Sequence, residues 1–193
     1  MKAVRIACVL LILMVLCLLI PSATASSVPI DVEHSRVTIR AFKSGLFSAL
    51  AHDHEINAPL HSGRIDSSAP SVELRFDVRS LKVLDPELSA ADRVKVQQTM
   101  LSDKVLDAER FSEIIFRSQT VKSLGENRFQ VEGELTLHGV TRSIMVPVSL
   151  ASGRYTGTVK LKQTEFGITP VKLFGGAVKL KDVVEISFDI VSK

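Results

Sequence analysis

Two histidines flank an aspartate at His52, Asp53 and His54. An imidazole can bind a metal ion, exchange a proton near neutral pH or hydrogen-bond a polar group. If the strand expected around Ile56 extends back through this segment, both histidines lie on its inward face, because side chains alternate along a strand. His61 has the opposite parity, so the three histidines do not form a ready metal site.

A metal site would need a further ligand, such as His34 or a carboxylate on a neighbouring strand. The more ordinary interpretation is that His52 and His54 hydrogen-bond at the strand entrance, where they could meet a polar head group. We therefore expect no metal and no cofactor. A metal- or pH-responsive binding protein built on these two histidines is an alternative.

Other chemistry-bearing patterns are weak. The sequence has no G-x-S-x-G elbow, no phosphate-binding glycine loop and no H-E-x-x-H motif, so we expect no catalytic residue and a binding protein rather than an enzyme. Arg36, Arg40 and Lys43 could place positive charge near an anionic head group. We favour a solvated outer face for them, because surface Lys and Arg are ordinary.

The N-terminal residues 1–25 have the order of a secretory signal peptide. Two basic residues precede the apolar run 6–20, and the triplet Ala23-Thr24-Ala25 follows it. The run is shorter than the roughly 20 residues of a membrane-spanning helix. We expect cleavage after Ala25 and a periplasmic or secreted protein whose residues 26–193 form one domain. An uncleaved N-terminal anchor is the alternative.

Charge and cysteine content argue against a nucleic-acid-binding protein and against a disulfide-stabilised domain. Cleavage would lower the Lys and Arg count from 24 to 22, against 21 acidic residues, and no basic run is present, so nucleic-acid binding is not expected. Cys8 and Cys17 both lie in the segment that would be removed. The mature domain therefore has no disulfide and depends on core burial for its stability.

Most of the remaining chain alternates between apolar and polar residues, which is typical of half-buried strands. The clearest case is Val72, Leu74, Phe76 and Val78 with charged residues between them. Similar alternation is present in residues 37–41, 56–60, 129–137, 144–150, 155–163 and 184–190. Short turns rich in Gly and Asn connect several of these segments, so neighbours are expected to run antiparallel.

One segment, Ser89 to Leu106, predicts an amphipathic helix instead. It begins with a Ser89-x-x-Asp92 signature. Its expected apolar positions are Val94, Met100, Leu101, Val105 and Leu106. We expect this helix to lie on a long crossover and to cover an open end or seam of the sheet.

An all-β sheet of about eight strands with one apolar face must pair with a second sheet or close, and closure also hides its edges. We therefore expect an antiparallel β-barrel with one crossover helix. Small residues at Ala58, Gly133 and Gly157 would leave room in its lumen, although side chains fill many small barrels. The candidate lumen residues are Ile39, Ala41, His52, His54, Ile56, Ala58, Leu74, Phe76, Leu135, Leu137, Tyr155 and Phe188.

Several segments together resemble the YceI-like, polyisoprenoid-binding proteins. They cover nearly the whole mature chain in the same order, at residues 30–37, 100–118, 133–142, 166–168 and 181–186. The resemblance implies an extended lipocalin-like barrel, periplasmic or secreted, that holds an isoprenoid or other long-chain lipid in its lumen. Residues 51–55 depart from the commoner pattern of the family.

We therefore expect a protein that carries or sequesters a lipid. A structural exported barrel that contacts another protein is a further alternative, and a homodimer is compatible with the sequence.

Overall fold

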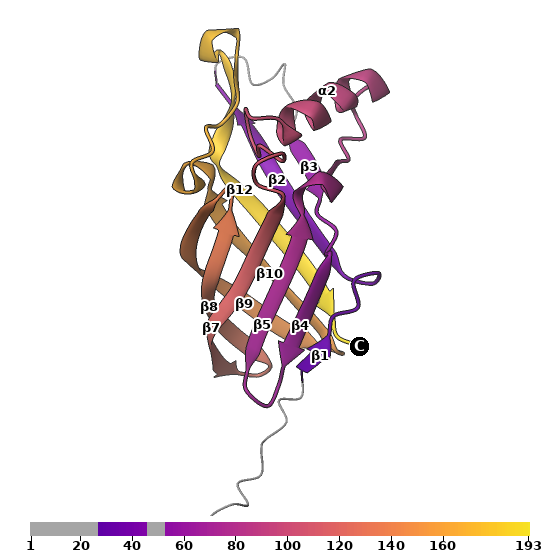
Figure 1. Ribbon diagram of the computed structural model, residues 1–193, viewed down its shortest axis with the longest axis vertical. Coiled ribbons are helices and arrows are strands. Elements are labelled where there is room, and N and C mark those ends of the chain that lie inside the picture. Colours follow the sequence, from indigo (N-terminus) through magenta and orange to yellow (C-terminus); the bar gives the residue numbers. More distant parts are fainter. Residues whose placement is uncertain (1–26, 46–52) are drawn as a thin grey trace, which may run out of the picture.

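The computed structural model describes residues 27–45 and 53–193, which form one antiparallel sheet of twelve strands. Figure 1 shows how this sheet curls round on itself. The strands are Ser27–Pro29 (β1), Arg36–Ser44 (β2), His54–Asn57 (β3), Ser62–Asp66 (β4), Ser71–Asp77 (β5), Lys82–Val83 (β6), Glu113–Gly125 (β7), Arg128–Leu137 (β8), Val140–Ala151 (β9), Arg154–Lys162 (β10), Lys172–Leu173 (β11) and Val178–Val191 (β12). Their order in the sheet is β1-β4-β5-β7-β8-β9-β10-β12-β2-β3-β6, and β11 pairs with β12.

The sheet closes through one continuous stretch of chain. β3 pairs with β2, and after a few residues the same stretch becomes β4 and pairs with β5. Between them, the Ala58 amide donates to the Val37 carbonyl and the His61 amide donates to the Arg75 carbonyl, both at 2.9 Å. The sheet thus curls back on itself, which confirms the expected all-β barrel.

The inward faces follow the predicted alternation. Every predicted strand overlaps an observed one, and the apolar positions of β2, β5, β8, β9, β10 and β12 point into the barrel. The count of about eight strands is lower than the twelve observed, partly because the closing stretch is divided into β3 and β4. The short β1 and β11 have too few residues to show a periodicity, and the short β6 was not predicted.

The long strand β7 has no clean alternation in its sequence. Its start contains three consecutive apolar residues, Ile114, Ile115 and Phe116, and the register against β8 shifts between Ser118 and Thr120. The shift inverts the parity, so Ile114 and Phe116 face the lumen before it and Val121 faces the lumen after it.

The predicted helix forms, but it is shorter than expected. It spans Ala90–Leu101 (α2), and the Ser89 hydroxyl accepts a hydrogen bond from the Asp92 amide at 3.1 Å. It ends because the chain folds back over its last turn: the Leu106 amide donates to the Met100 carbonyl. Val94, predicted to face inward, is 54% exposed.

As expected, the helix covers one end of the barrel (Figure 1). The Gln97 side chain fastens it to β6, accepting from the Val83 amide and donating to the Leu81 carbonyl, both at 2.8 Å. Of the helices that lie in the described ranges, none is long and apolar enough to cross a membrane.

Candidate functional site

A large cavity of about 1430 Å³ occupies the barrel. Its wall extends from Ser67 and Pro70, in the turn between β4 and β5, to Val96 and Met100 on α2 at the opposite end. Small-molecule pockets usually have roughly 300–1,000 Å³, so this cavity exceeds them. The interior is therefore open along the barrel, and the alternative of a lumen filled by side chains is wrong.

The predicted lumen residues can be located on this wall. The eleven that line the cavity are Ile39, Ala41, His54, Ile56, Ala58, Leu74, Phe76, Leu135, Leu137, Tyr155 and Phe188. His52 lies outside the described residues. Contact of these side chains with a ligand stays a prediction.

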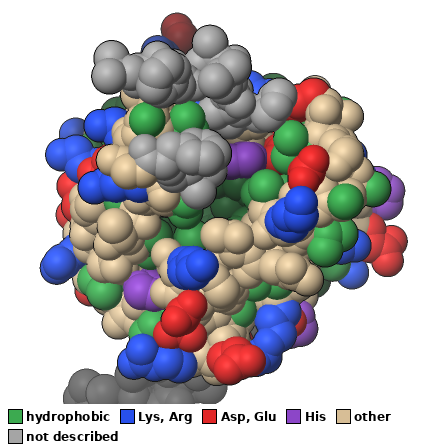
Figure 2. Space-filling model, turned by 90° about the horizontal axis from the view of Figure 1, so that it is seen from above, with side chains coloured by type: hydrophobic (Ala, Val, Ile, Leu, Met, Phe, Trp, Pro, Cys, Tyr) green, Lys and Arg blue, Asp and Glu red, His purple; other side chains and the backbone are tan. Residues whose placement is uncertain are grey.

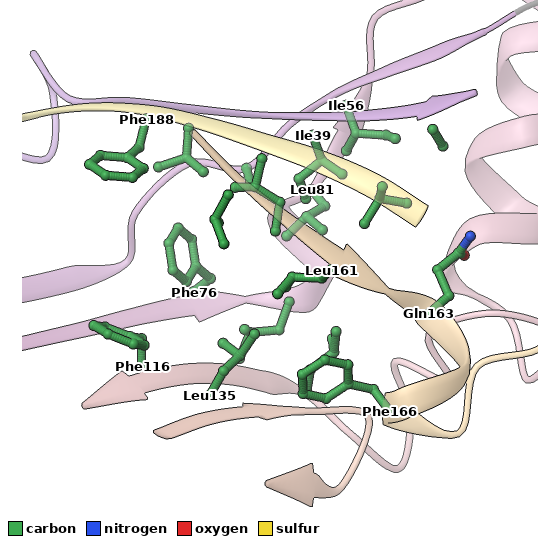
Figure 3. Close-up of a pocket in the computed structure, with 18 of the residues that line it drawn as sticks. Ile39, Ile56, Phe76, Leu81, Phe116, Leu135, Leu161, Gln163, Phe166 and Phe188 are labelled. Carbon is green, nitrogen blue, oxygen red and sulfur yellow. The ribbon is translucent and has the colours of Figure 1, made fainter. Parts of the chain in front are cut away.

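The wall of the cavity is almost entirely hydrocarbon. Figure 3 shows Phe76, Phe116 and Phe188 around one part of the lumen, with Ile39, Ile56 and Leu81 nearer the end where Gln163 lies. Many of the same side chains belong to the buried core, including Phe76, Phe116 and Leu161. The core of this domain and the wall of its cavity are thus largely the same residues.

The two glycines predicted to leave room in the lumen have a different role. A Cβ at Gly133 would lie 2.7 Å from Cζ of Phe116, and one at Gly157 would lie 2.5 Å from Cζ of Phe188. Each glycine therefore accommodates a phenylalanine ring packed against the sheet. The prediction that these glycines create free space is wrong, because the neighbouring strands supply rings that occupy it.

The end of the cavity beside α2, which we call the mouth, holds a buried histidine–carboxylate pair. Nδ1 of His54 lies 2.6 Å from Oδ2 of Asp85, and the other carboxylate oxygen of Asp85 accepts the Glu55 amide at 2.7 Å. The Asp85 side chain is fully buried, and the His54 side chain is 21% exposed. An ionised carboxylate only accepts hydrogen bonds, so it holds the proton on Nδ1 and fixes the ring orientation.

Backbone pairing brings these two residues together although they are 31 positions apart in the chain. His54 begins β3 and lies opposite Ala41 of β2, on the inward face. Asp85 follows β6, which pairs with β3, and the Leu84 amide donates to the Glu55 carbonyl at 2.8 Å. The β3–β6 ladder therefore continues just far enough to place the carboxylate against the imidazole.

Sequence reasoning missed Asp85, although a signal was present. Leu81, Val83 and Asp85 alternate, so a strand through the first two would place the carboxylate on the same inward side. Leu81 and Val83 do line the cavity.

The remaining predicted polar residues separate into two groups. Lys43 lines the mouth, whereas Arg40 lies on the outer face and pairs with Glu55 at 3.2 Å. Grouping Lys43 with Arg36 and Arg40 was wrong, because Lys43 has the inward parity of β2 and the two arginines have the outward parity. Figure 2, which looks onto this end, shows a hollow lined by hydrophobic side chains with charged side chains around it.

The histidines do not assemble into a metal site within the part of the chain that the structure describes. His34 lies at the opposite end of β2 and bonds Asp31 at 2.9 Å, and His61 is exposed on the outside. No group of three or more His, Cys, Asp or Glu side chains suited to a metal ion occurs in residues 27–45 and 53–193. His34 therefore does not complete a site with His54.

The opposite, far end of the cavity carries one carboxylate on its wall, that of Asp66. Its Oδ1 accepts hydrogen bonds from the Ala69 amide at 3.0 Å and from the amide and hydroxyl of Ser68 at 2.9 and 2.7 Å. These bonds, that from the Ala69 amide most of all, hold the pKa of Asp66 below its ordinary value of 3.8.

Comparison with solved structures supports the fold. BcnA of Burkholderia cenocepacia superposes with a TM-score of 0.63 at 20% identity, over 83% of this chain and 98% of that one. A mutant YceI protein of Campylobacter jejuni superposes with a TM-score of 0.51 at 11% identity, over 72% and 81%. At such identities the likeness shows the fold alone.

Comparison with curated sequences finds relatives that match parts of the chain. A UPF0312 protein of Vibrio cholerae is 31% identical over 111 residues, which are 52% of this chain and 54% of that protein. A UPF0312 protein of Pseudomonas syringae pv. tomato is 36% identical over 77 residues, 35% of this chain and 40% of that protein. The chain thus spans about half, or less, of the length of these relatives.

Residues 29–192 match the model of the YceI-like domain, which includes every strand from the end of β1 to β12 and the whole cavity wall. The chain belongs to the YceI-like family.

Proposed function

We propose that this chain is an exported binding protein that holds a long apolar ligand, an isoprenoid or another lipid, in the barrel lumen for carriage or sequestration. The observation that carries the proposal is the cavity of about 1430 Å³, whose hydrocarbon wall extends along the barrel. Burial of about a dozen methylenes contributes roughly 10 kcal/mol gross. That exceeds the lower estimates of the free energy lost on association, about 4 kcal/mol.

Family membership supports the ligand class, because the YceI-like family is known for binding polyisoprenoids. Export is supported by the sequence of residues 1–25, with cleavage proposed after Ala25. The proposal assigns no catalytic residue. It needs only a wall that replaces water around a hydrocarbon chain.

The test of lipid binding uses protein purified from its native host without detergent. Mass spectrometry of an organic extract is expected to show a long-chain lipid in a fixed ratio to the protein. Ile144→Trp places a large side chain in the lumen from β9 and should abolish the co-purified lipid. Met145→Trp, on the outward face of the same strand, is the matched control and should retain it, because Met145 is 55% exposed.

An extract without lipid, combined with no uptake of an added C20 isoprenoid, would contradict the proposal. Export has its own test, in which cell fractionation and N-terminal sequencing of the mature protein are expected to give Ser26 as the first residue. An unprocessed chain retained in the cytoplasm would contradict the export part and leave lipid binding to be decided by the extract.

A further inference from the structure

A hairpin at the mouth of the barrel concentrates positive charge. Residues 171–181, which we call the basic hairpin, contain Lys172, Lys179 and Lys181 and no Asp or Glu. β11 and the start of β12 form its two arms, and Figure 1 shows it in gold, projecting at the end where α2 lies. Val178 and Leu180 of the same hairpin line the cavity. The basic hairpin thus joins the cavity wall to the outer rim of the mouth.

Two of these lysines lie opposite each other in the hairpin. Lys172 is the cross-strand partner of Lys179, and both are exposed. Like charges directly opposite on an antiparallel pair destabilise it, because their Cβ atoms lie only about 5 Å apart. Neither lysine forms an ion pair with any residue of the ranges 27–45 and 53–193. An anionic surface outside the protein would relieve this repulsion.

Lys181 extends the same charge along β12. It lies two residues beyond Lys179, so the two side chains share a face of the strand. Its Nζ lies 5.7 Å from the centre of the Phe42 ring on β2. The next residue, Asp182, is the adjoining carboxylate, and it accepts from the amide and the hydroxyl of Thr164 at 2.9 and 2.7 Å. Positive charge therefore exceeds negative charge along this segment.

The same end of the barrel exposes apolar side chains. Leu84, which follows β6, is 42% exposed, and Val94 on α2 is 54% exposed. Exposed hydrocarbon together with basic side chains is what peripheral proteins use to bind the interface of an anionic bilayer. A free anion would contact the lysines and leave these apolar groups in water. A lipid surface therefore fits both features better.

We infer that the mouth docks onto the surface of an anionic lipid bilayer, with the basic hairpin against the head groups and α2 beside it. The contact is with the bilayer surface and needs no head group inside the barrel. Docking places the open end of the cavity against the membrane, so an apolar ligand passes between bilayer and lumen with less of its surface exposed to water. This inference rests on the proposed function and adds the partner with which the lumen exchanges its ligand.

The test is co-sedimentation with vesicles of the protein purified from its native host without detergent. One kind of vesicle is phosphatidylcholine alone, and the other contains about one third phosphatidylglycerol. At low salt we expect the partition into the anionic vesicles to be about tenfold or more stronger, because each lysine near such a surface contributes about fivefold. The difference should shrink at about 0.5 M salt, because the attraction is screened.

The role of the basic hairpin is tested by replacing Lys172, Lys179 and Lys181 together. Replacement by Gln should reduce the partition into anionic vesicles by about tenfold or more, whereas replacement by Arg should retain it, because Arg keeps the charge. Both variants should keep the co-purified lipid. Lys172→Gln alone, with an expected loss of about fivefold, serves if the triple Gln variant does not fold.

The matched control removes the same number of positive charges at the end of the barrel away from α2. Lys122 and Arg128 lie beside the turn between β7 and β8, Lys193 follows β12, and all three are exposed. Their joint replacement by Gln should leave the partition within about threefold of the wild type. A loss equal to that of the hairpin variant would overturn the inference, because it would show that only the net charge matters.

Co-purified lipid is measured in the same preparations, so the two proposals fail separately. Equal partition of the wild type into both kinds of vesicle, with lipid present in the extract, would overturn docking and leave the proposed function standing. A folded triple Gln variant that binds anionic vesicles as tightly as the wild type would overturn the role of the basic hairpin. An extract without lipid, with no uptake of an added isoprenoid, would overturn the proposed function.

Discussion

The buried polar groups at the two ends of the barrel differ in their hydrogen-bond partners. At the far end, the Ser35 hydroxyl donates to the Asp31 carbonyl at 2.6 Å and accepts the Val191 amide at 3.0 Å, and Asp66 is bonded by its own turn. At the mouth, Asp85 is also buried, but it binds a histidine whose ring lines the cavity. The far end uses these polar groups to join segments of the fold, whereas the buried carboxylate at the mouth orients an imidazole on the cavity wall.

The walls of the two ends differ as well. Toward the far end, Phe188 packs over Gly157 and fills the space that the glycine leaves. Toward the mouth, the helix α2 covers the lumen, and none of its residues is fully buried. The far wall is thus packed ring against backbone, whereas the mouth is covered by a helix whose residues all keep some exposure.

The largest expected effect concerns the buried carboxylate at the mouth. Asp85→Ala should lower the free energy of unfolding by about 2–4 kcal/mol, because it leaves the His54 Nδ1 and the Glu55 amide without an acceptor in a buried place. Urea denaturation measures the loss. Asp85→Asn keeps an acceptor and should lose less, and Asp66→Ala at the far end is the comparison. An Asp85→Ala variant as stable as the wild type would show that the His54–Asp85 pair does not stabilise the fold.

The packed far wall is tested by a single methyl group. Gly157→Ala should destabilise the protein by about 1–3 kcal/mol, because the new Cβ would overlap the Phe188 ring and the Pro147 carbonyl oxygen. Thermal unfolding measures it. Thr158→Ala, an exposed neighbour on β10, is the control, with a change of less than about 0.5 kcal/mol. Equal thermal unfolding midpoints for both variants would show that the far wall accommodates the additional methyl group.

The attachment of α2 over the mouth is tested by removing the hydrogen bonds of Gln97. Gln97→Ala removes two hydrogen bonds between α2 and the chain around β6, each contributing about 1 kcal/mol. Amide hydrogen exchange in α2 should become faster, while the strands keep their protection. Gln98→Ala, on the exposed side of the same helix, should leave the exchange unchanged. If α2 in the Gln97→Ala protein stays as protected as in the wild type, other contacts hold the helix in place.

The smallest effect is expected from pH at the far end. The pKa of Asp66 is lowered in the fold, mainly by the Ala69 amide, so its contribution to stability is complete above 3.8 and is lost as the pH falls through the lower folded-state pKa. Between about pH 5 and pH 3, the melting temperature of the wild type should fall by more than that of the Asp66→Asn variant. Parallel acid profiles for the two proteins would show that the turn does not depend on this charge.

Much of the cavity wall could be predicted from single strands. In β2, Ile39 and Ala41 face the lumen because residues of equal parity share a face, and the same rule places Leu74 and Phe76 in β5. The rule fails in β7, where consecutive apolar residues and a register shift interrupt the period. The helical pattern placed Val94 on the inward side, which was wrong: Val96 and Met100 line the cavity, and Val94 is 54% exposed.

The sequence by itself determined the all-β class, the inward face of most strands and the presence of a covering helix, since these depend on local periodicity and capping. Only the tertiary structure decided that Phe116 and Phe188 occupy the glycine gaps, that a cavity of about 1430 Å³ nevertheless remains, and that Asp85 meets His54. The physical reason is that these features arise between strands distant in the chain. Their spacing is set by the closure of the sheet, and no local pattern encodes it.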